Sequence, residues 1–86
     1  MKLSKLKIYG SVNTTVTGKL LYLVLDKLAG RHGEIIISQR NISAGLNISR
    51  SAIKRNLRRL ESLGALRIVP MYNKDGGRSA NKYIIQ

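Results

Sequence analysis

The residues of this sequence that are best suited to hold a ligand are cationic and lie close together, between positions 50 and 59. Five of the sixteen Lys and Arg residues fall within these ten positions. Ile53, Leu57 and Leu60 recur at i, i+4 and i+7, and therefore share one face of a helix. At about 100° per residue, the opposite face carries Ser51, Lys54, Arg55 and Arg58, with Arg50 and Arg59 at its flanks. A helix that is buried on one side and cationic on the other suits the major groove of DNA.

The overall composition also indicates a polyanionic ligand. Sixteen Lys and Arg against four Asp and Glu give a formal net charge of +12 and a pI near 10.8. Such an excess is typical of proteins that bind nucleic acids. A basic surface that served only solubility would scatter its charges, whereas these cluster, so the pattern favours a binding face.

The sequence offers no catalytic or metal-binding constellation. His32 is the only histidine, there is no cysteine, and only four residues are acidic. Asp26 falls within an expected helix, Glu61 is expected to pair locally with Arg58, and Asp75 belongs to a turn signal. We therefore predict no enzymatic activity, no metal and no cofactor.

Eighty-six residues are enough for one small domain. Residues 1–13 interleave lysines with apolar residues and are expected to form a basic arm or an added strand, or a partly ordered terminus, while residues 14–86 form the domain. The longest apolar run, 20–25, is far shorter than the ~20 residues of a spanning helix, and no signal-peptide pattern is present. We expect a soluble cytoplasmic protein.

Local signals predict the order of elements. A helix is expected from a cap at Thr14 or Thr17 to about Ala29, ended by Gly30, followed by a loop and a short strand at 34–37. Ser38 is expected to cap a helix at 39–46. Strands are expected at 65–69 and 82–86, joined through a hairpin turn at 75–77.

The junction between the second and third helices is predicted to be a sharp turn. Asn47 is expected to take a positive φ there, because Asn adopts this conformation more readily than most residues. Ser49 would then cap the basic helix, and Gly64 would end it in a left-handed conformation.

The first helix has more apolar residues than one core-facing side requires. The excess at Tyr22, Leu25 and Ala29 has two explanations: it packs against the N-terminal segment or against a second copy of the chain. Of the two we favour the second, with Tyr22 and Leu25 in a homodimer interface.

The segment ISAGLNISRSAIKRNLRRLESLGAL is similar to the pattern ISxALGISRSTVxRxLRRLExxGLI of bacterial and archaeal winged helix-turn-helix regulators. In addition, GGRSANKYII resembles the wing and last strand of these domains, including those of plasmid and phage replication initiators. The resemblance covers residues 14–86 and implies an α+β fold with three helices and a small three-stranded antiparallel sheet. Asn47 stands where a turn glycine is usual, and Gly45 where alanine is commoner.

The same resemblance implies roles for individual residues. Arg50, Ser51 and Lys54 would read bases, whereas Arg55, Arg58 and Arg59 would contact phosphates. Lys74 and Arg78 flank the wing turn, with which family members reach the adjacent minor groove or backbone. The predicted DNA-binding set is Ser49, Arg50, Ser51, Lys54, Arg55, Arg58, Arg59, Lys74 and Arg78.

We therefore expect sequence-specific binding of double-stranded DNA by a homodimeric prokaryotic or mobile-element transcriptional regulator associated with the nucleoid. No effector domain follows the wing, so no small-molecule ligand is expected. The alternatives are a DNA-binding module in replication or chromatin organisation, an RNA-binding protein, or a protein-interaction winged helix. The absence of Phe and Trp argues against stacking on single-stranded nucleic acid.

Overall fold

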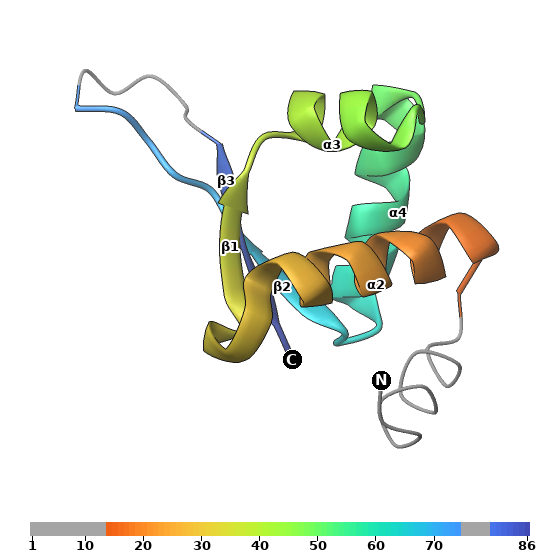
Figure 1. Ribbon diagram of the computed structural model, residues 1–86, viewed down its shortest axis with the longest axis horizontal. Coiled ribbons are helices and arrows are strands. Elements are labelled where there is room, and N and C mark those ends of the chain that lie inside the picture. Colours follow the sequence, from red (N-terminus) through yellow and green to blue (C-terminus); the bar gives the residue numbers. More distant parts are fainter. Residues whose placement is uncertain (1–13, 75–79) are drawn as a thin grey trace.

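The structure is a computed structural model that describes residues 14–74 and 80–86 (Figure 1). Three α-helices and three strands follow one another in these residues. The predicted arm at 1–13, the predicted turn at 75–77 and Arg78 lie outside the described residues. In chain order the elements are α2 (Val16–Ala29), the 3-10 helix η1 (Gly30–His32), β1 (Glu34–Ile37), α3 (Gln39–Leu46), α4 (Arg50–Ser62), β2 (Leu66–Val69) and β3 (Asn81–Ile85).

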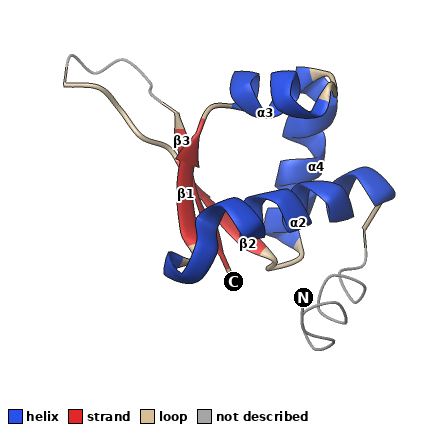
Figure 2. Ribbon diagram, in the orientation of Figure 1, coloured by secondary structure: helices blue, strands red, loops and turns tan. Residues whose placement is uncertain are grey.

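The three strands form one antiparallel sheet in the order β1-β3-β2. Tyr83 of the central strand lies opposite Ile35 on β1 and Ile68 on β2. Figure 2 shows the strands together at one side of the domain, with α3 and α4 beside them. The last strand therefore pairs with β1, which precedes it by about fifty residues in the sequence.

The core forms where α2, α4 and the inner face of the sheet meet. Tyr83 is fully buried there, together with Leu21 and Leu25 of α2 and Leu66 of β2. Ile53, Leu57 and Leu60 are each 0% exposed, so the predicted core face of the basic helix is confirmed. Burying a side chain of this size contributes about 1.5–3 kcal/mol, so these residues fix how α4 is oriented.

Most predicted boundaries are confirmed to within one residue, but the residue that caps α2 differs from both predicted caps. The hydroxyl of Thr15 caps this helix by accepting a hydrogen bond from the amide of Gly18 at 3.0 Å. The predicted caps, Thr14 and Thr17, are therefore wrong. Gly30 ends the helix as predicted, with φ 61. The loop expected after it is instead the short helix η1.

The placement of Tyr22 and Leu25 in a dimer interface is wrong. Tyr22 is 3% exposed and Leu25 0% exposed within a single chain, and both belong to the core. The apolar side chains of α2 that do reach the surface are Val16, Leu20 and Leu28. Periodicity indicated an unusually wide apolar face, but only the packing of α4 and the sheet decides which side of it is covered.

Within residues 14–74 and 80–86, no helix has the length and apolar character needed to cross a membrane.

Candidate nucleic-acid interface

The turn between α3 and α4 sets the angle between these two helices. Asn47 has φ 54 and is the one non-glycine residue with positive φ in the described part of the chain, as predicted. Its amide bonds to the carbonyl of Ser43, which also accepts from the amide of Ile48 at 3.2 Å. In return the hydroxyl of Ser43 donates to the carbonyl of Ile48. Sequence reasoning missed Ser43, which joins the two sides of the turn.

Both helices of this unit begin at a serine cap, as predicted. Ser38 accepts a hydrogen bond from the amide of Asn41 at 3.0 Å, and Ser49 accepts one from the amide of Ala52 at 3.3 Å. Each bond satisfies one of the free amides of the first turn. The remaining free amides give each helix start a partial positive charge. The first turn of α4 is therefore attractive to anions through its backbone as well as its side chains.

The cations of α4 all lie on the surface. Its buried positions are the three core residues named above and Asn56, which is 8% exposed. The five predicted cations are exposed: Arg50, Lys54, Arg55, Arg58 and Arg59. One helix therefore combines a buried, mostly apolar side with an exposed side on which five cations lie.

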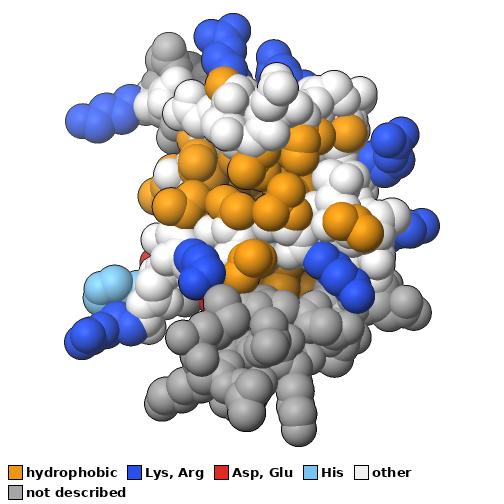
Figure 3. All heavy atoms as spheres, turned by 45° about the vertical axis from the view of Figure 1, so that its right-hand side comes forward, with side chains coloured by type: hydrophobic (Ala, Val, Ile, Leu, Met, Phe, Trp, Pro, Cys, Tyr) orange, Lys and Arg blue, Asp and Glu red, His pale blue; other side chains and the backbone are white. Residues whose placement is uncertain are grey.

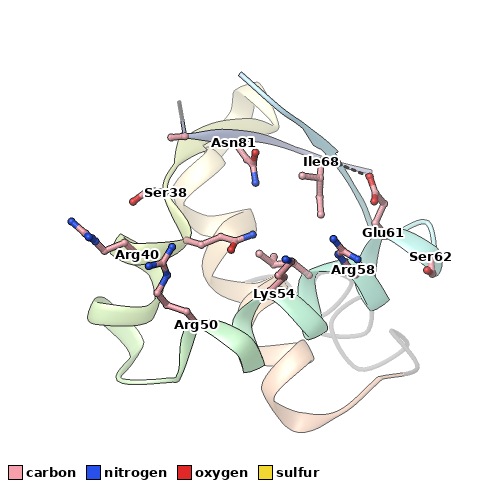
Figure 4. A pocket seen from close by; sticks show the side chains of 12 residues that line it. Ser38, Arg40, Arg50, Lys54, Arg58, Glu61, Ser62, Ile68 and Asn81 are labelled. Atoms are coloured by element: carbon pink, nitrogen blue, oxygen red, sulfur yellow. Dashed lines mark hydrogen bonds between the residues drawn. The ribbon is translucent and has the colours of Figure 1, made fainter. Parts of the chain in front are cut away.

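A basic concavity of about 950 Å³ lies between this helix and the sheet. Three of the predicted cations line it from α4, namely Arg50, Lys54 and Arg58, because they follow one another at every fourth position. Figure 4 shows Lys54 and Arg58 extending from α4 on the side of the sheet, where Asn81 of β3 faces them. Arg50 lies at the end of the concavity next to α3.

The predicted site is thus divided into two rows. Ser51, Arg55 and Arg59 are also spaced by four residues and are exposed, but they do not line the concavity. Lys74 is exposed beyond β2 and likewise does not line it. The concavity and the outer row together present positive charge over a broad part of the α4 surface.

Arg40 is a residue of this surface that sequence reasoning missed. It lies in the first turn of α3, is exposed, and lines the concavity together with Ser38 and Gln39. In Figure 4 its guanidinium extends into solvent on the same side as that of Arg50. The available signal was a basic residue two positions after a serine cap, where the start of a helix attracts phosphate.

The acidic residue of the concavity has a structural partner. The exposed carboxylate of Glu61 accepts a hydrogen bond from the amide of Ile68 at 2.9 Å, shown as the dashed line in Figure 4. The predicted local pairing of Glu61 with Arg58 is therefore replaced by a link between the end of α4 and β2. This link holds the helix against the sheet and leaves the Arg58 side chain beside the concavity.

No group of three or more His, Cys, Asp or Glu side chains that could hold a metal occurs among the residues that the structure describes. Apart from the Glu61 carboxylate, which bonds to β2, the polar groups that line the concavity are guanidinium, ammonium, hydroxyl and amide groups. These groups donate hydrogen bonds and positive charge, which suits phosphate oxygens and the acceptor atoms of guanine.

Residues 36–67 match the model of a protein family described as winged helix-turn-helix DNA-binding. The matched segment runs from β1 through α3, the turn and α4 into β2, so it contains every cation of the two rows. Comparisons with curated proteins and with solved structures found no match. The match, together with three helices and a three-stranded antiparallel sheet, confirms the predicted fold class.

Proposed function

From the premise that this chain carries a winged helix-turn-helix DNA-binding domain, we propose that it binds double-stranded DNA sequence-specifically, with α4 in the major groove. Its role is that of a prokaryotic or mobile-element transcriptional regulator, which acts in the cytoplasm on the nucleoid, as a homodimer. Its activity is binding and not catalysis. The domain comprises residues 14–86.

The observation that carries this proposal is the two-sidedness of α4. Ile53, Leu57 and Leu60 are 0% exposed, whereas all five cations of the same helix are exposed. The major groove is about 12 Å wide and accepts one helix of about 10–12 Å diameter. A protein-interaction helix would not need this density of positive charge opposite its core.

The positions of the polar residues along α4 support two different roles, contact with bases and contact with phosphates. Arg50, Ser51 and Lys54 belong to the N-terminal half, which in a recognition helix projects furthest into the groove. Arg55, Arg58 and Arg59 lie further along and neutralise phosphates, which fix the register but carry no sequence information. Ser49, at the start of α4, also binds DNA. Lys74 and Arg78, which flank residues 75–77 in the sequence, contact the adjacent minor groove or backbone.

The test is a comparison of duplex DNA, single-stranded DNA and single-stranded RNA by fluorescence anisotropy at matched salt. With about five phosphate contacts, log Kobs for the duplex should fall with log salt at a slope near −4 to −5. Selection from random duplexes should then yield a consensus. Equal or tighter binding of single-stranded RNA would contradict the proposal.

A matched pair of charge substitutions gives the control. Arg55→Ala and Lys27→Ala each remove one exposed cation, the first from α4 and the second from α2. If α4 lies on DNA, Arg55→Ala weakens binding and reduces the salt slope by about one, and Lys27→Ala changes neither appreciably. Equal effects of the two would indicate attraction to the whole basic protein instead of docking through α4.

A further inference from the structure

The first two turns of α4, residues 50–57, present mainly hydrogen-bond donors to solvent. Their exposed side chains are those of Arg50, Ser51, Lys54 and Arg55. Arginine and lysine side chains only donate, and the serine hydroxyl is the one group of the four that can also accept. Figure 4 shows Arg50 and Lys54 extending from successive turns of the helix. The chemistry of this surface therefore restricts which base edges it can bind.

The one side chain of α4 that could recognise adenine is engaged within the protein. Asn56 combines a donor and an acceptor, as bidentate contact with adenine requires. It is 8% exposed, its side-chain amide donates to the carbonyl of Ala52 at 2.8 Å, and its side-chain carbonyl accepts from the hydroxyl of Thr15 at 2.7 Å. Asn56 is consequently not available to a base.

The one side chain of α4 that could recognise cytosine is engaged as well. Cytosine presents an amino donor in the major groove, from which Asp or Glu accepts. Glu61 is the one acidic residue of the helix, lies in its last turn, and accepts a hydrogen bond from the amide of Ile68 at 2.9 Å. Residues 50–57, which would enter the groove first, contain no acidic residue.

Recognition of thymine through its methyl group would need an apolar side chain on the exposed side of α4. In the described part of the chain the large exposed hydrophobic side chains lie outside this helix, and three of them belong to α2: Val16, Leu20 and Leu28. Figure 3 shows hydrophobic side chains across the middle of one molecular face, with Lys and Arg side chains projecting around them. In the first two turns of α4, Ala52 is half-buried and the other apolar residues are core.

We propose that α4 selects duplexes that present guanine in the major groove, and that Arg50 and Lys54 each bind the O6 and N7 atoms of one guanine. This inference rests on the proposed function, since it takes the N-terminal half of α4 to lie in the groove. Guanine presents two acceptors that one arginine or lysine binds together, whereas adenine and thymine present one acceptor each. Four residues of helix rise about 6 Å and base pairs are about 3.4 Å apart, so the two guanines lie within about two base pairs of each other.

The test starts from a duplex selected from random sequences, in which each guanine is replaced in turn by 7-deazaguanine. This base still pairs with cytosine, but it carries a C–H group in place of the N7 acceptor. Anisotropy titrations should find two positions, at most about two base pairs apart, where the replacement raises Kd at least about fivefold. Hypoxanthine at the same positions keeps O6 and N7 and lacks the minor-groove amino group, so it should change Kd little.

Protein variants assign each guanine to a side chain. Arg50→Ala should make one of the two positions insensitive to 7-deazaguanine, and Lys54→Ala the other, because the contact to that base is already lost. Arg59→Ala, the control on the same helix, should weaken binding and keep both sensitivities. All three residues are exposed, so the melting temperatures should stay within a few degrees of the wild type.

The possible failures are distinguishable. A selected site without guanine, or guanines that all tolerate 7-deazaguanine, would overturn this inference and leave duplex binding by α4 intact. Sensitivities that persist unchanged in Arg50→Ala and Lys54→Ala would overturn the assignment to these residues. The absence of any preferred duplex, or tighter binding of single-stranded RNA, would overturn the proposed function and this inference with it.

Discussion

The hydroxyl of Thr15 joins the start of α2 to the middle of α4, because it donates to the side-chain carbonyl of Asn56 at 2.7 Å. The same oxygen accepts the capping bond from Gly18, so it is both donor and acceptor. Asn56 in turn donates to the carbonyl of Ala52 at 2.8 Å, one turn earlier in its own helix. This chain of bonds satisfies the one polar side chain on the otherwise apolar buried side of α4.

The first prediction is that Thr15 and Asn56 act on stability as a coupled pair. Asn56→Ala should reduce the free energy of unfolding by about 1–3 kcal/mol, because it removes both side-chain bonds at a buried position. Thr15→Ala should cost about 1 kcal/mol or somewhat more, since it removes the cap as well. Urea denaturation of both single variants and the double variant should give a coupling energy of at least about 0.5 kcal/mol. Strict additivity would show that the bond between them contributes nothing.

The second prediction concerns the left-handed residue of the turn. Asn47→Ala should destabilise the domain by about 1–2 kcal/mol, because a Cβ atom without a compensating polar group is strained at φ 54. Asn47→Gly should be neutral or slightly stabilising, because glycine adopts this conformation without strain. Thermal denaturation followed by circular dichroism measures both. Equal melting temperatures for the two variants would mean that backbone conformation does not limit stability here.

The third prediction compares two exposed glycines, whose replacement by alanine should change the free energy of unfolding in opposite directions. Gly45 lies inside α3 with no atom within 4 Å of an added Cβ, so Gly45→Ala should raise the free energy of unfolding by about 0.5–1 kcal/mol. Gly64 has equally open surroundings but φ 76, so Gly64→Ala should lower it by about 1 kcal/mol or more. Urea denaturation measures both, and two changes of the same sign would contradict this account.

The sequence was sufficient where a short-range signal determines the structure. Ser38 and Ser49 are caps because their hydroxyls reach amides three residues later, and Asn47 is left-handed because few other residues tolerate that backbone. The spacing of Ile53 and Leu57 fixed the buried side of α4, and hence the cationic side, since both follow from one helical period.

The sequence was insufficient where the burial or bonding of a residue depends on partners far away in the chain. Tyr22 and Leu25 were placed at a surface, and they are buried because α4 and the sheet cover that side of α2. Glu61 bonds to Ile68 across a helix-to-strand connection whose geometry no local pattern contains. Arg40 was missed for the same reason, because its position beside Arg50 depends on how the turn folds α3 against α4.

The fourth prediction assigns Arg40 to the DNA backbone. It is exposed in the first turn of α3 and makes no part of the core, so Arg40→Ala should leave the melting temperature within a few degrees of the wild type. On duplex DNA the variant should bind all sequences more weakly and reduce the salt slope by about one. Anisotropy titrations at several salt concentrations measure this. An unchanged slope would place DNA away from the α3 side of the concavity.

The last prediction separates reading from anchoring within α4. Arg50 begins the helix and lines the concavity, whereas Arg59 lies more than two turns later in the outer row, and both are exposed. Arg50→Ala should cost about 1–3 kcal/mol on the best selected site and relax the preference at one base pair, as expected for loss of a contact to a base. Arg59→Ala should weaken all sequences alike and reduce the salt slope by about one.

Binding of both variants is measured on the selected site and on duplexes with each position changed in turn. Both should keep the wild-type melting temperature within a few degrees, because neither side chain belongs to the core face of Ile53, Leu57 and Leu60. If Arg50→Ala kept full specificity and Arg59→Ala lost it, α4 would lie in the groove with its C-terminal half inward, contrary to the docking proposed above. If Arg50→Ala lost specificity only because the domain unfolded, the melting curve would show it. Arg50→Lys keeps the charge but not the bidentate geometry, and would therefore decide between loss of a base contact and unfolding of the domain.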